Sequence, residues 1–381
     1  MNLKQISSLY PALKTTELFG RYITNSHIES CLNNLSDAVI STVGSTVESR
    51  PIYSLQYGIG PTKILIWSQM HGNESTTTKA LCDFFKFLET GQDFSKQILE
   101  ACILVVIPIL NPDGAERYTR LNANNIDLNR DAQDLSQPES MTLRKVYNDF
   151  KPNYCFNLHG QRTIFGAGAK GAVATLSFLA PSQDANRSIT ENRKKAMAVI
   201  AEISTFLKPE LAQGIGRYDD GFNLNCVGDT FQAFEIPTLL FEAGHYPDDY
   251  NREEVRRFVF IAILKGLEVI SNGVEPAKYK DYLKIPENSK CFYDIIIRNA
   301  RVYEDHEELY DVAIQYKEQL HAKCIKFSPV VENISNLEGF SGHKEFDAKG
   351  SFVKTIENFY LEIGNEIDFV LLNNEKISLI P

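Results

Sequence analysis

Two patterns of hydrophobic positions alternate along most of this chain, short unbroken apolar runs and apolar residues at helical spacing. The unbroken runs, which predict buried strands, are residues 64–67, 102–109, 154–158 and 238–241. Between the runs, Leu81, Phe84 and Leu88 are spaced as on one face of a helix, and a second such period begins at Val255. Apolar strands that alternate with amphipathic helices predict an α/β protein, in which helices cover both faces of a sheet.

Each predicted strand leads into polar residues. His71-Gly-Asn-Glu74 follows the first strand and Asn111-Pro-Asp-Gly114 follows the second. His159 comes directly after the third strand, and Glu242 comes directly after the fourth. In open α/β sheets, ligands bind beyond the carboxyl ends of the strands. These polar residues are therefore placed where a functional site is expected.

The pattern changes after residue 270. Residues 271–278, which include Gly273 and Pro276, are typical of a linker. Short β-type runs follow at residues 292–297, 311–316, 325–331, 359–363 and 367–372. We therefore expect a larger domain at residues 1–275 and a small β-rich domain at residues 279–381. About the first 45 residues look helical.

Composition and charge exclude several classes of protein. The 381 residues are 43% hydrophobic and 23% charged, as in ordinary globular proteins. With 39 Lys and Arg against 49 Asp and Glu, the formal net charge is −10 and no block of basic residues occurs, so no nucleic-acid partner is expected. No apolar stretch approaches the roughly 18–20 residues that span a bilayer, so no membrane partner is expected either.

The N-terminal residues and the cysteines bear on the cellular compartment. Residues 1–8 lack the apolar segment of a secretory signal, which for a full-length chain predicts a cytoplasmic protein. The seven cysteines are scattered, and none forms a C-x-x-C pair. We therefore expect reduced, structural thiols instead of a zinc ribbon or a redox site.

A metal site is one interpretation of the polar residues at the strand ends. A catalytic zinc ion commonly takes two histidines and one glutamate and leaves a position open for water. His71, Glu74 and His159 supply that set. An H-x-x-E pair also arises by chance, and a buried histidine is more often a hydrogen-bonded core residue. Spacing alone leaves both interpretations open.

A specific resemblance comes from the longer segment at residues 111–130, in which Asn-Pro-Asp-Gly is followed by R-x-N-A-N-x-x-D-L-N-R. Together with His-Gly-Asn-Glu, a strand that ends in His and a strand that ends in Phe-Glu, it resembles the zinc metallocarboxypeptidases of the carboxypeptidase A/B type, of the shorter regulatory and bacterial kind. The resemblance covers roughly residues 42–270. It implies a mixed, mostly parallel central sheet with helices on both faces.

The resemblance also implies roles for individual residues. His71, Glu74 and His159 correspond to the ligands of one Zn²⁺ ion, and Asp127 to the carboxylate that orients the first zinc histidine. Glu242 corresponds to the catalytic glutamate, which accepts a proton from the attacking water and returns one to the leaving amine.

Three further residues correspond to groups that hold the substrate. Arg120 resembles the arginine that polarises the scissile carbonyl. Asn129 and Arg130 resemble the pair that binds the terminal carboxylate, for which a guanidinium is suited because it donates two parallel hydrogen bonds. Asn73 stands where some members carry an arginine, which implies a weaker outer carboxylate subsite.

The family also places a tyrosine on a loop about twenty residues before the glutamate. Tyr218 is our candidate, and Tyr246 and Tyr250 are poorer alternatives because they follow Glu242. The pocket that sets side-chain preference lies between Tyr218 and Glu242. Asp219, Asp220 and Asp229 lie in that stretch and favour a basic terminal residue, whereas Arg217 favours an acidic one.

We therefore expect a zinc-dependent metallocarboxypeptidase that acts on a peptide or modified peptide with a free C-terminal carboxylate. An N-acyl amino acid amidohydrolase, similar to aspartoacylase and succinylglutamate desuccinylase, is the alternative, because that group shares several of the same motifs. A binding protein that has lost the reaction is a third hypothesis. The natural substrate and the oligomeric state stay open at this point.

Overall fold

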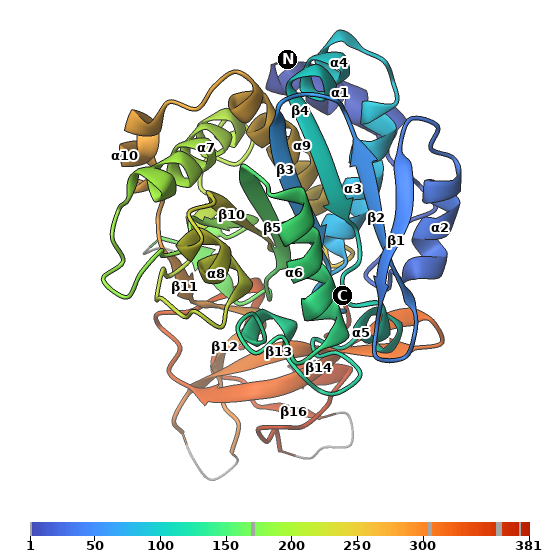
Figure 1. Ribbon diagram of the computed structural model, residues 1–381. Coiled ribbons are helices and arrows are strands. Elements are labelled where there is room, and N and C mark those ends of the chain that lie inside the picture. Colours follow the sequence, from blue (N-terminus) through green and yellow to red (C-terminus); the bar gives the residue numbers. More distant parts are fainter. Residues whose placement is uncertain (1, 169–171, 304–306, 356–359, 373–374) are drawn as a thin grey trace.

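The computed structural model describes residues 2–168, 172–303, 307–355, 360–372 and 375–381 (Figure 1). Its centre is an eight-stranded sheet of order β1-β2-β4-β3-β5-β10-β8-β9. The strands are β1 (Val39–Ser45), β2 (Pro51–Tyr57), β3 (Thr62–Ser68), β4 (Cys102–Ile107), β5 (Tyr154–Gly160), β8 (Leu176–Leu179), β9 (Ile215–Arg217) and β10 (Thr238–Ala243). The four strands predicted from apolar runs are β3, β4, β5 and β10, which lie side by side and run parallel.

Helices cover both faces of this sheet. One face carries α1 (Leu3–Leu13), α2 (Asn25–Asn33), α3 (Thr76–Leu88), α4 (Asp93–Ala101), α7 (Glu191–Leu207) and α9 (Glu253–Ser271). The other face carries α6 (Pro138–Phe150) and α8 (Val227–Ala233). The remaining short helices before residue 285 are α5 (Pro112–Arg117), η1 (Leu128–Arg130), η2 (Pro276–Lys278) and α10 (Tyr279–Tyr282).

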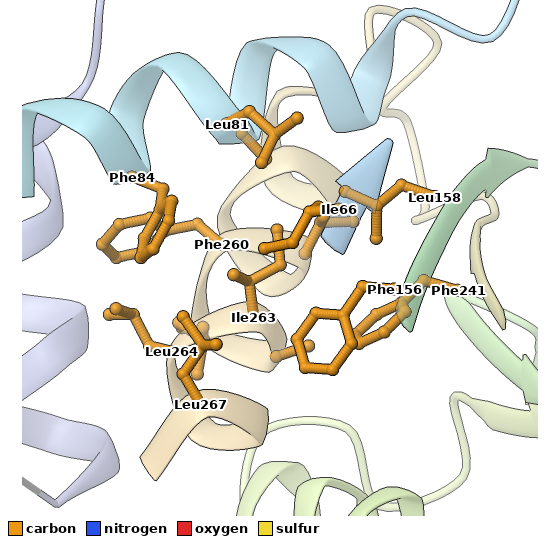
Figure 2. Close-up of a cluster of buried hydrophobic side chains, with 14 of the residues drawn as sticks. Ile66, Leu81, Phe84, Phe156, Leu158, Phe241, Phe260, Ile263, Leu264 and Leu267 are labelled. Carbon is orange, nitrogen blue, oxygen red and sulfur yellow. The ribbon is translucent and has the colours of Figure 1, made fainter. Parts of the chain in front are cut away.

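The two faces are built by alternate residues of the same strands. On β3, Ile64 and Ile66 join the larger apolar cluster, whereas Leu65 and Trp67 join the smaller one on the opposite face. The larger cluster packs β3, β5 and β10 against α3 and α9 (Figure 2). A strand buried on both faces needs apolar residues at every position, which is why these strands are unbroken apolar runs in the sequence. The predicted fold class, an α/β protein with a mixed, mostly parallel sheet, is confirmed.

The prediction for the N-terminal region is wrong in part. Helices α1 and α2 occupy residues 3–13 and 25–33, but residues 39–45 form the edge strand β1, which pairs antiparallel with β2. Five of its seven positions, from Val39 to Thr42 and Ser45, are exposed, so no buried apolar run marks it in the sequence. Its pairing with β2 decides its structure.

The C-terminal part is rich in strands, as predicted. One sheet has the order β14-β13-β12-β15, and a second consists of β16, β17 and β18. These strands are β12 (Phe292–Ala300), β13 (Tyr310–His321), β14 (Cys324–Ser335), β15 (Ser341–Asp347), β16 (Val353–Thr355), β17 (Phe369–Leu372) and β18 (Glu375–Ser378). The predicted run at 359–363 is wrong where it can be judged, because residues 360–363 are not in a strand and residue 359 lies outside the described residues.

The C-terminal strands have their own apolar core, which includes Ile295, Val312, Val331 and Val370. A small sheet of β11 (Asn288–Lys290), β6 (Phe165–Ala167) and β7 (Ala172–Val173) joins this part to the larger one. A domain boundary between residues 275 and 279 stays a prediction. Among the helices in the described ranges, none is long and apolar enough to cross a membrane.

Candidate metal centre and substrate cleft

His71 and Glu74 lie in the turn between β3 and α3. The backbone N–H of Glu74 donates to the carbonyl of His71 at 3.0 Å, which closes the turn and brings both side chains to the same side. Gly72 lets this turn approach the loop after β4, since a Cβ at that position would lie 1.9 Å from the carbonyl carbon of Gly114. The glycine between the two candidate ligands is therefore required by packing.

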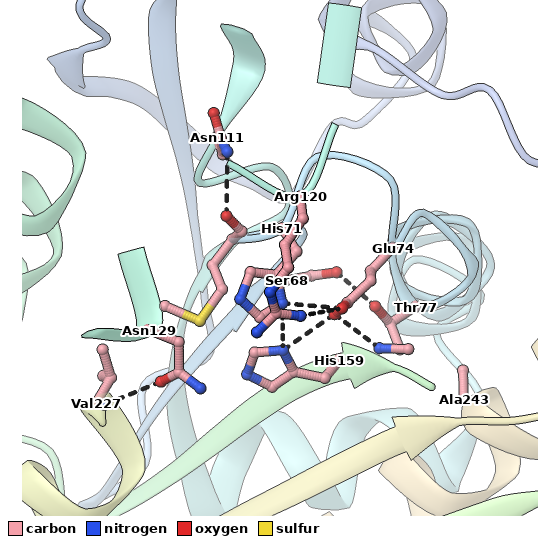
Figure 3. A network of polar contacts seen from close by, with 12 residues as sticks. Ser68, His71, Glu74, Thr77, Asn111, Arg120, Asn129, His159, Val227 and Ala243 are labelled. Carbon is pink, nitrogen blue, oxygen red and sulfur yellow. Dashed lines mark hydrogen bonds and ion pairs between the residues drawn. The ribbon is translucent and has the colours of Figure 1, made fainter. Parts of the chain in front are cut away.

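His159, the next-to-last residue of β5, completes the cluster (Figure 3). The Glu74 carboxylate lies 2.9 Å from His71 Nδ1 and 3.0 Å from His159 Nδ1. The two Nδ1 atoms are 3.2 Å apart. Each residue offers one potential ligand atom within 4.8 Å of the others, and both imidazoles are 2% exposed. The structure therefore brings together the three residues that the sequence singled out.

The chemistry of this donor set fits a zinc ion. Two imidazole nitrogens and a carboxylate from different segments converge on one point, which is the ligand set of many catalytic zinc sites. Burial acts to raise the pKa of Glu74, but His71 and His159 hold that pKa below its ordinary value. Burial lowers the pKa of His159, which favours the neutral imidazole that a metal requires.

Asp127 and Arg120 flank this cluster. The Asp127 carboxylate accepts from His71 Nε2 at 3.0 Å and from the backbone N–H of Asn129 at 2.9 Å. It also accepts two hydrogen bonds from the Arg120 guanidinium, at 3.1 and 3.0 Å. Asp127 thus fixes the ring of His71 with Nδ1 facing the cluster, the arrangement that orients metal-binding histidines. Arg120 also reaches Glu74 at 3.3 Å and remains 45% exposed at the cleft.

Glu242 lies on β10 in direct register with His159 on β5. Its Oε2 atom is buried and has no hydrogen-bond partner among the residues of the structure that are described. Burial and the nearby Glu74 carboxylate raise the pKa of Glu242 well above its ordinary value. A carboxyl with these properties is suited to exchange a proton with a substrate or a water, because no protein group competes for it.

Asn129 and Arg130 lie in η1, two and three residues after Asp127. The Asn129 side-chain oxygen accepts from the backbone N–H of Val227 at 3.0 Å, so its amide group is held in place (Figure 3). Arg130 is exposed and donates to the carbonyl of Asn129 at 2.7 Å. Arg130 has no carboxylate partner in the described part of the chain, and its guanidinium is therefore open to a ligand.

These side chains line one cavity of about 820 Å³, and among the predicted metal, catalytic and carboxylate-binding residues only Asp127 is not part of its lining. Tyr218 lines it as well, with its ring 5.3 Å from that of Phe165. Burial, together with the Glu242 and Glu74 carboxylates, raises the pKa of Tyr218. The poorer alternatives do not line this cavity, and the hydroxyl of Tyr250 donates to Asp294 at 3.0 Å instead.

Some of the residues proposed to set side-chain preference line this cavity, and others do not. Asp219 and Asp229 line the cavity, whereas Asp220 pairs with Arg193 outside it. Burial raises the pKa of Asp229 to about 7, so this carboxyl is a weaker attractor of cations than an ordinary aspartate. Arg217 does not line the cavity, and it pairs with Glu287 at 2.7 Å. Its role in favouring acidic terminal residues therefore stays a prediction, for which this position gives no support.

Several residues of the cleft were not predicted from the sequence. Asn157 lines the cavity two residues before His159, and both polar atoms of its side chain are buried without a partner among the described residues. A polar residue within an apolar strand was a usable signal for it. Arg252 carries no such signal. Its guanidinium is buried and donates to the carbonyls of Gln161 and Ala243, so it ties together the ends of β5 and β10.

Comparison with known proteins agrees with this site. Residues 25–165 match the family model described as zinc carboxypeptidase. This segment contains His71, Glu74 and His159 and the Asn-Pro-Asp-Gly and D-L-N-R motifs. Residues 25–165 thus match a zinc carboxypeptidase domain, and the resemblance recognised in its motifs is confirmed.

Individual relatives match over limited lengths. Carboxypeptidase 2 of Trichophyton rubrum is 28% identical over 99 residues, which are 26% of this chain and 18% of that protein. Carboxypeptidase SOL1 of Arabidopsis thaliana is 27% identical over 172 residues, which are 38% of this chain and 34% of that protein. The chain therefore aligns with about a fifth to a third of the length of these relatives.

A solved structure supports the fold over a longer stretch. The metallo-carboxypeptidase of Burkholderia cenocepacia superposes on 65% of this chain and 70% of its own, with a TM-score of 0.53 and 18% sequence identity. At this identity the comparison shows a shared fold.

Proposed function

We propose that this protein is a zinc-dependent carboxypeptidase, which hydrolyses the last amide bond of a peptide with a free terminal carboxylate. The proposal rests above all on the convergence of His71, Glu74 and His159 on one point, with Glu242 in register beside them and its Oε2 atom without a partner among the described residues. The family match of residues 25–165 supports the same activity.

The zinc ion belongs to the proposal, with His71 Nδ1, His159 Nδ1 and the Glu74 carboxylate as its ligands. When bound, zinc would act as a Lewis acid and lower the pKa of a coordinated water toward neutrality. Asp127 keeps the His71 ring oriented for this role through the hydrogen bond at Nε2. The ligand set would be complete only when both imidazoles are neutral at Nδ1.

The residues around the centre would bind the substrate in one orientation. Arg130 and the amide of Asn129 would hold the terminal carboxylate by charge-assisted hydrogen bonds. Arg120 would donate to the scissile carbonyl oxygen and stabilise the negative charge that develops there, an interaction that strengthens in the transition state. The ring of Tyr218 would cover the bound terminal residue from the same cavity.

Glu242 would carry the proton during hydrolysis. Its Oε2 atom accepts a proton from the attacking water as the oxygen of that water bonds to the carbonyl carbon. The same proton then passes to the leaving nitrogen as the C–N bond breaks. The water therefore adds its hydroxyl to the new carboxyl and its proton to the new amine, and Glu242 is regenerated.

The activity is tested with peptides that differ only in their last residue, analysed by mass spectrometry with and without a chelator. We expect release of one C-terminal residue, abolished by the chelator and restored by zinc. The same peptides with a C-terminal carboxamide are the matched control and should be poor substrates, because Arg130 then lacks its anion. N-acetyl-aspartate and succinylglutamate are included, and hydrolysis of these compounds alone would instead indicate the amidohydrolase.

A further inference from the structure

The C-terminal strands contribute to the wall of the substrate cleft. Residues 316–319 of β13 line the same cavity as the metal cluster. Nothing in the sequence pattern of the β-rich part indicates this role, because residues 316–319 lie more than seventy positions after Glu242. The cleft is therefore assembled from both parts of the chain.

A half-buried carboxylate anchors this strand in the wall. Glu318 accepts from the Arg21 guanidinium at 3.1 Å and from the hydroxyl of Tyr118. Burial acts to raise the pKa of Glu318. The positive charge of Arg21 has the largest opposing effect and helps to hold this pKa below its ordinary value. The side chain is therefore an anion that is already paired. It fixes β13 in place next to Lys317.

A second segment is held against the same strands. Thr163, which follows Arg162, accepts from the Gln315 side chain at 2.9 Å, and its carbonyl accepts from His343 at 2.8 Å. On the other side of Arg162, the carbonyl of Gln161 accepts from Arg252 at 2.8 Å. The backbone on both sides of Arg162 is thus tied down at the mouth of the cavity.

Two cations in this wall have no counter-ion among the residues that the structure describes. Arg162 and Lys317 both line the cavity, and both side chains are exposed. Neither has an ion-pair partner within the described residues. Six basic and five acidic side chains line the cavity as a whole, so it is the placement of Arg162 and Lys317, and not the overall charge, that distinguishes this wall.

Side-chain contacts along the cleft indicate the order of its parts. Tyr118 reaches Glu318, and Arg120, two residues later, reaches Glu74 and Asp127. Asp127 in turn contacts Asn129, beside the carboxylate-binding Arg130. The metal cluster therefore lies between the carboxylate clamp and the β13 wall. In the proposed orientation, a peptide whose terminal carboxylate is at Arg130 would extend its preceding residues past the metal cluster toward Arg162 and Lys317, which line the same cavity.

We infer that Arg162 and Lys317 form a subsite for an acidic side chain on the residues that precede the scissile bond. This inference rests on the proposed carboxypeptidase activity for the orientation of the substrate. The preferred substrates are peptides with glutamate or aspartate before the residue that is removed. The C-terminal part thereby takes part in substrate selection.

The test uses peptides with a constant last residue and Glu, Gln or Lys immediately before it. For the wild type, we expect kcat/KM to be about three- to tenfold higher for Glu than for Gln, as one or two partly exposed ion pairs provide, and lowest for Lys. The ratio of kcat/KM for the Glu peptide to that for the Gln peptide should decrease as salt is added, because the charges of Arg162 and Lys317 are exposed to solvent.

Variants assign the preference to the two residues. Arg162→Gln and Lys317→Gln should each lower the ratio of kcat/KM for the Glu peptide to kcat/KM for the Gln peptide. The double variant should bring this ratio close to one. Lys323→Gln is the matched control, since Lys323 is an exposed lysine at the end of the same hairpin and does not line the cavity. The control should keep the wild-type ratio. An unchanged ratio in the double variant would overturn the subsite.

A binding measurement distinguishes the case in which the subsite proposal fails from the case in which the proposed activity fails. Fluorescence anisotropy of the same labelled peptides with Glu242→Gln protein reports affinity without turnover. Tighter binding of the Glu peptide, lost in the triple variant that also carries Arg162→Gln and Lys317→Gln, supports the subsite. Equal binding of the Glu and Gln peptides overturns it. If no peptide loses its last residue with the wild type, the carboxypeptidase proposal fails and the anisotropy result still decides the subsite.

Discussion

Glu242 and His159 occupy paired positions on the adjacent parallel strands β10 and β5. Side chains at paired positions of parallel strands project to the same side of the sheet. Arg252 holds the two strand ends together through the carbonyls of Gln161 and Ala243. A proposed proton carrier and a proposed metal ligand are thus placed side by side by backbone pairing, and no flexible loop separates them.

Replacement of Glu242 by glutamine should abolish most activity while metal binding persists. General acid–base catalysis by one side chain contributes about 10²- to 10⁴-fold, so we expect kcat to fall by that amount. Glutamine matches the volume of glutamate, and Glu242 Oε2 has no partner to lose among the described residues. Metal content, measured by mass spectrometry of the elements, should stay at the wild-type level. Equal activity of the variant and the wild type would eliminate the proposed chemistry.

Replacement of Asp127 by asparagine should weaken metal binding. The carboxylate orients His71 through Nε2 at 3.0 Å, and partners of this kind typically affect metal affinity by about 10- to 100-fold. Competition with a chromogenic chelator measures the change. Asp134→Asn is the control, because Asp134 is exposed and lies outside the cleft. Equal zinc affinity of the Asp127 and Asp134 variants would show that Asp127 has no such role.

The ion pair between Asp83 and Arg256 should be a large contributor to stability. Both side chains are 0% exposed, and the Arg256 guanidinium donates to the two carboxylate oxygens, each at 2.6 Å. Among the described residues, loss of Asp83 leaves the buried Arg256 with only the longer pair to Glu253, at 3.2 Å, so Asp83→Asn should lower the free energy of unfolding by up to about 3–5 kcal/mol. Urea unfolding measures this change. Asp149→Asn breaks the exposed pair with Lys145 and should change stability by less than ~1 kcal/mol.

Asp294 should make the protein less stable as the pH rises. Burial raises its pKa from the ordinary 3.8 to about 6 in the folded protein. Between these values the folded state keeps a proton that the unfolded state releases, so the stabilising contribution is present below about pH 4 and is lost as the pH rises toward 6. Tyr250, Gln315 and the backbone of Tyr316 donate to this carboxyl.

The comparison of wild type with Asp294→Asn isolates this effect from other titrating groups. We expect the wild type to lose stability relative to the variant between pH 4 and pH 6, by at most about 3 kcal/mol for a shift of two pKa units. Urea unfolding at several pH values in this range measures the difference. A difference that does not change with pH would contradict the raised pKa.

Much of the central sheet and of the metal cluster could be predicted from the sequence. Strands such as β3 are buried on both faces, so their apolar runs are local signals, and their polar ends mark the site. The edge strand β1 was missed because it is mostly exposed and has no such run. The pairing of Arg217 with Glu287 could not be foreseen, because the two residues lie seventy positions apart.

By itself, the sequence determined which elements form the core and which short motifs supply His71, Glu74, His159 and Glu242, because burial and metal chemistry leave local patterns of residue type. Only the tertiary structure decided which distant segments close the cleft. Arg252 behind the strand ends and residues 316–319 in the wall occupy their places through contacts with residues far away in the chain. Such contacts depend on which helices and strands pack together, and the hydrophobic periodicity of one element does not indicate its partner.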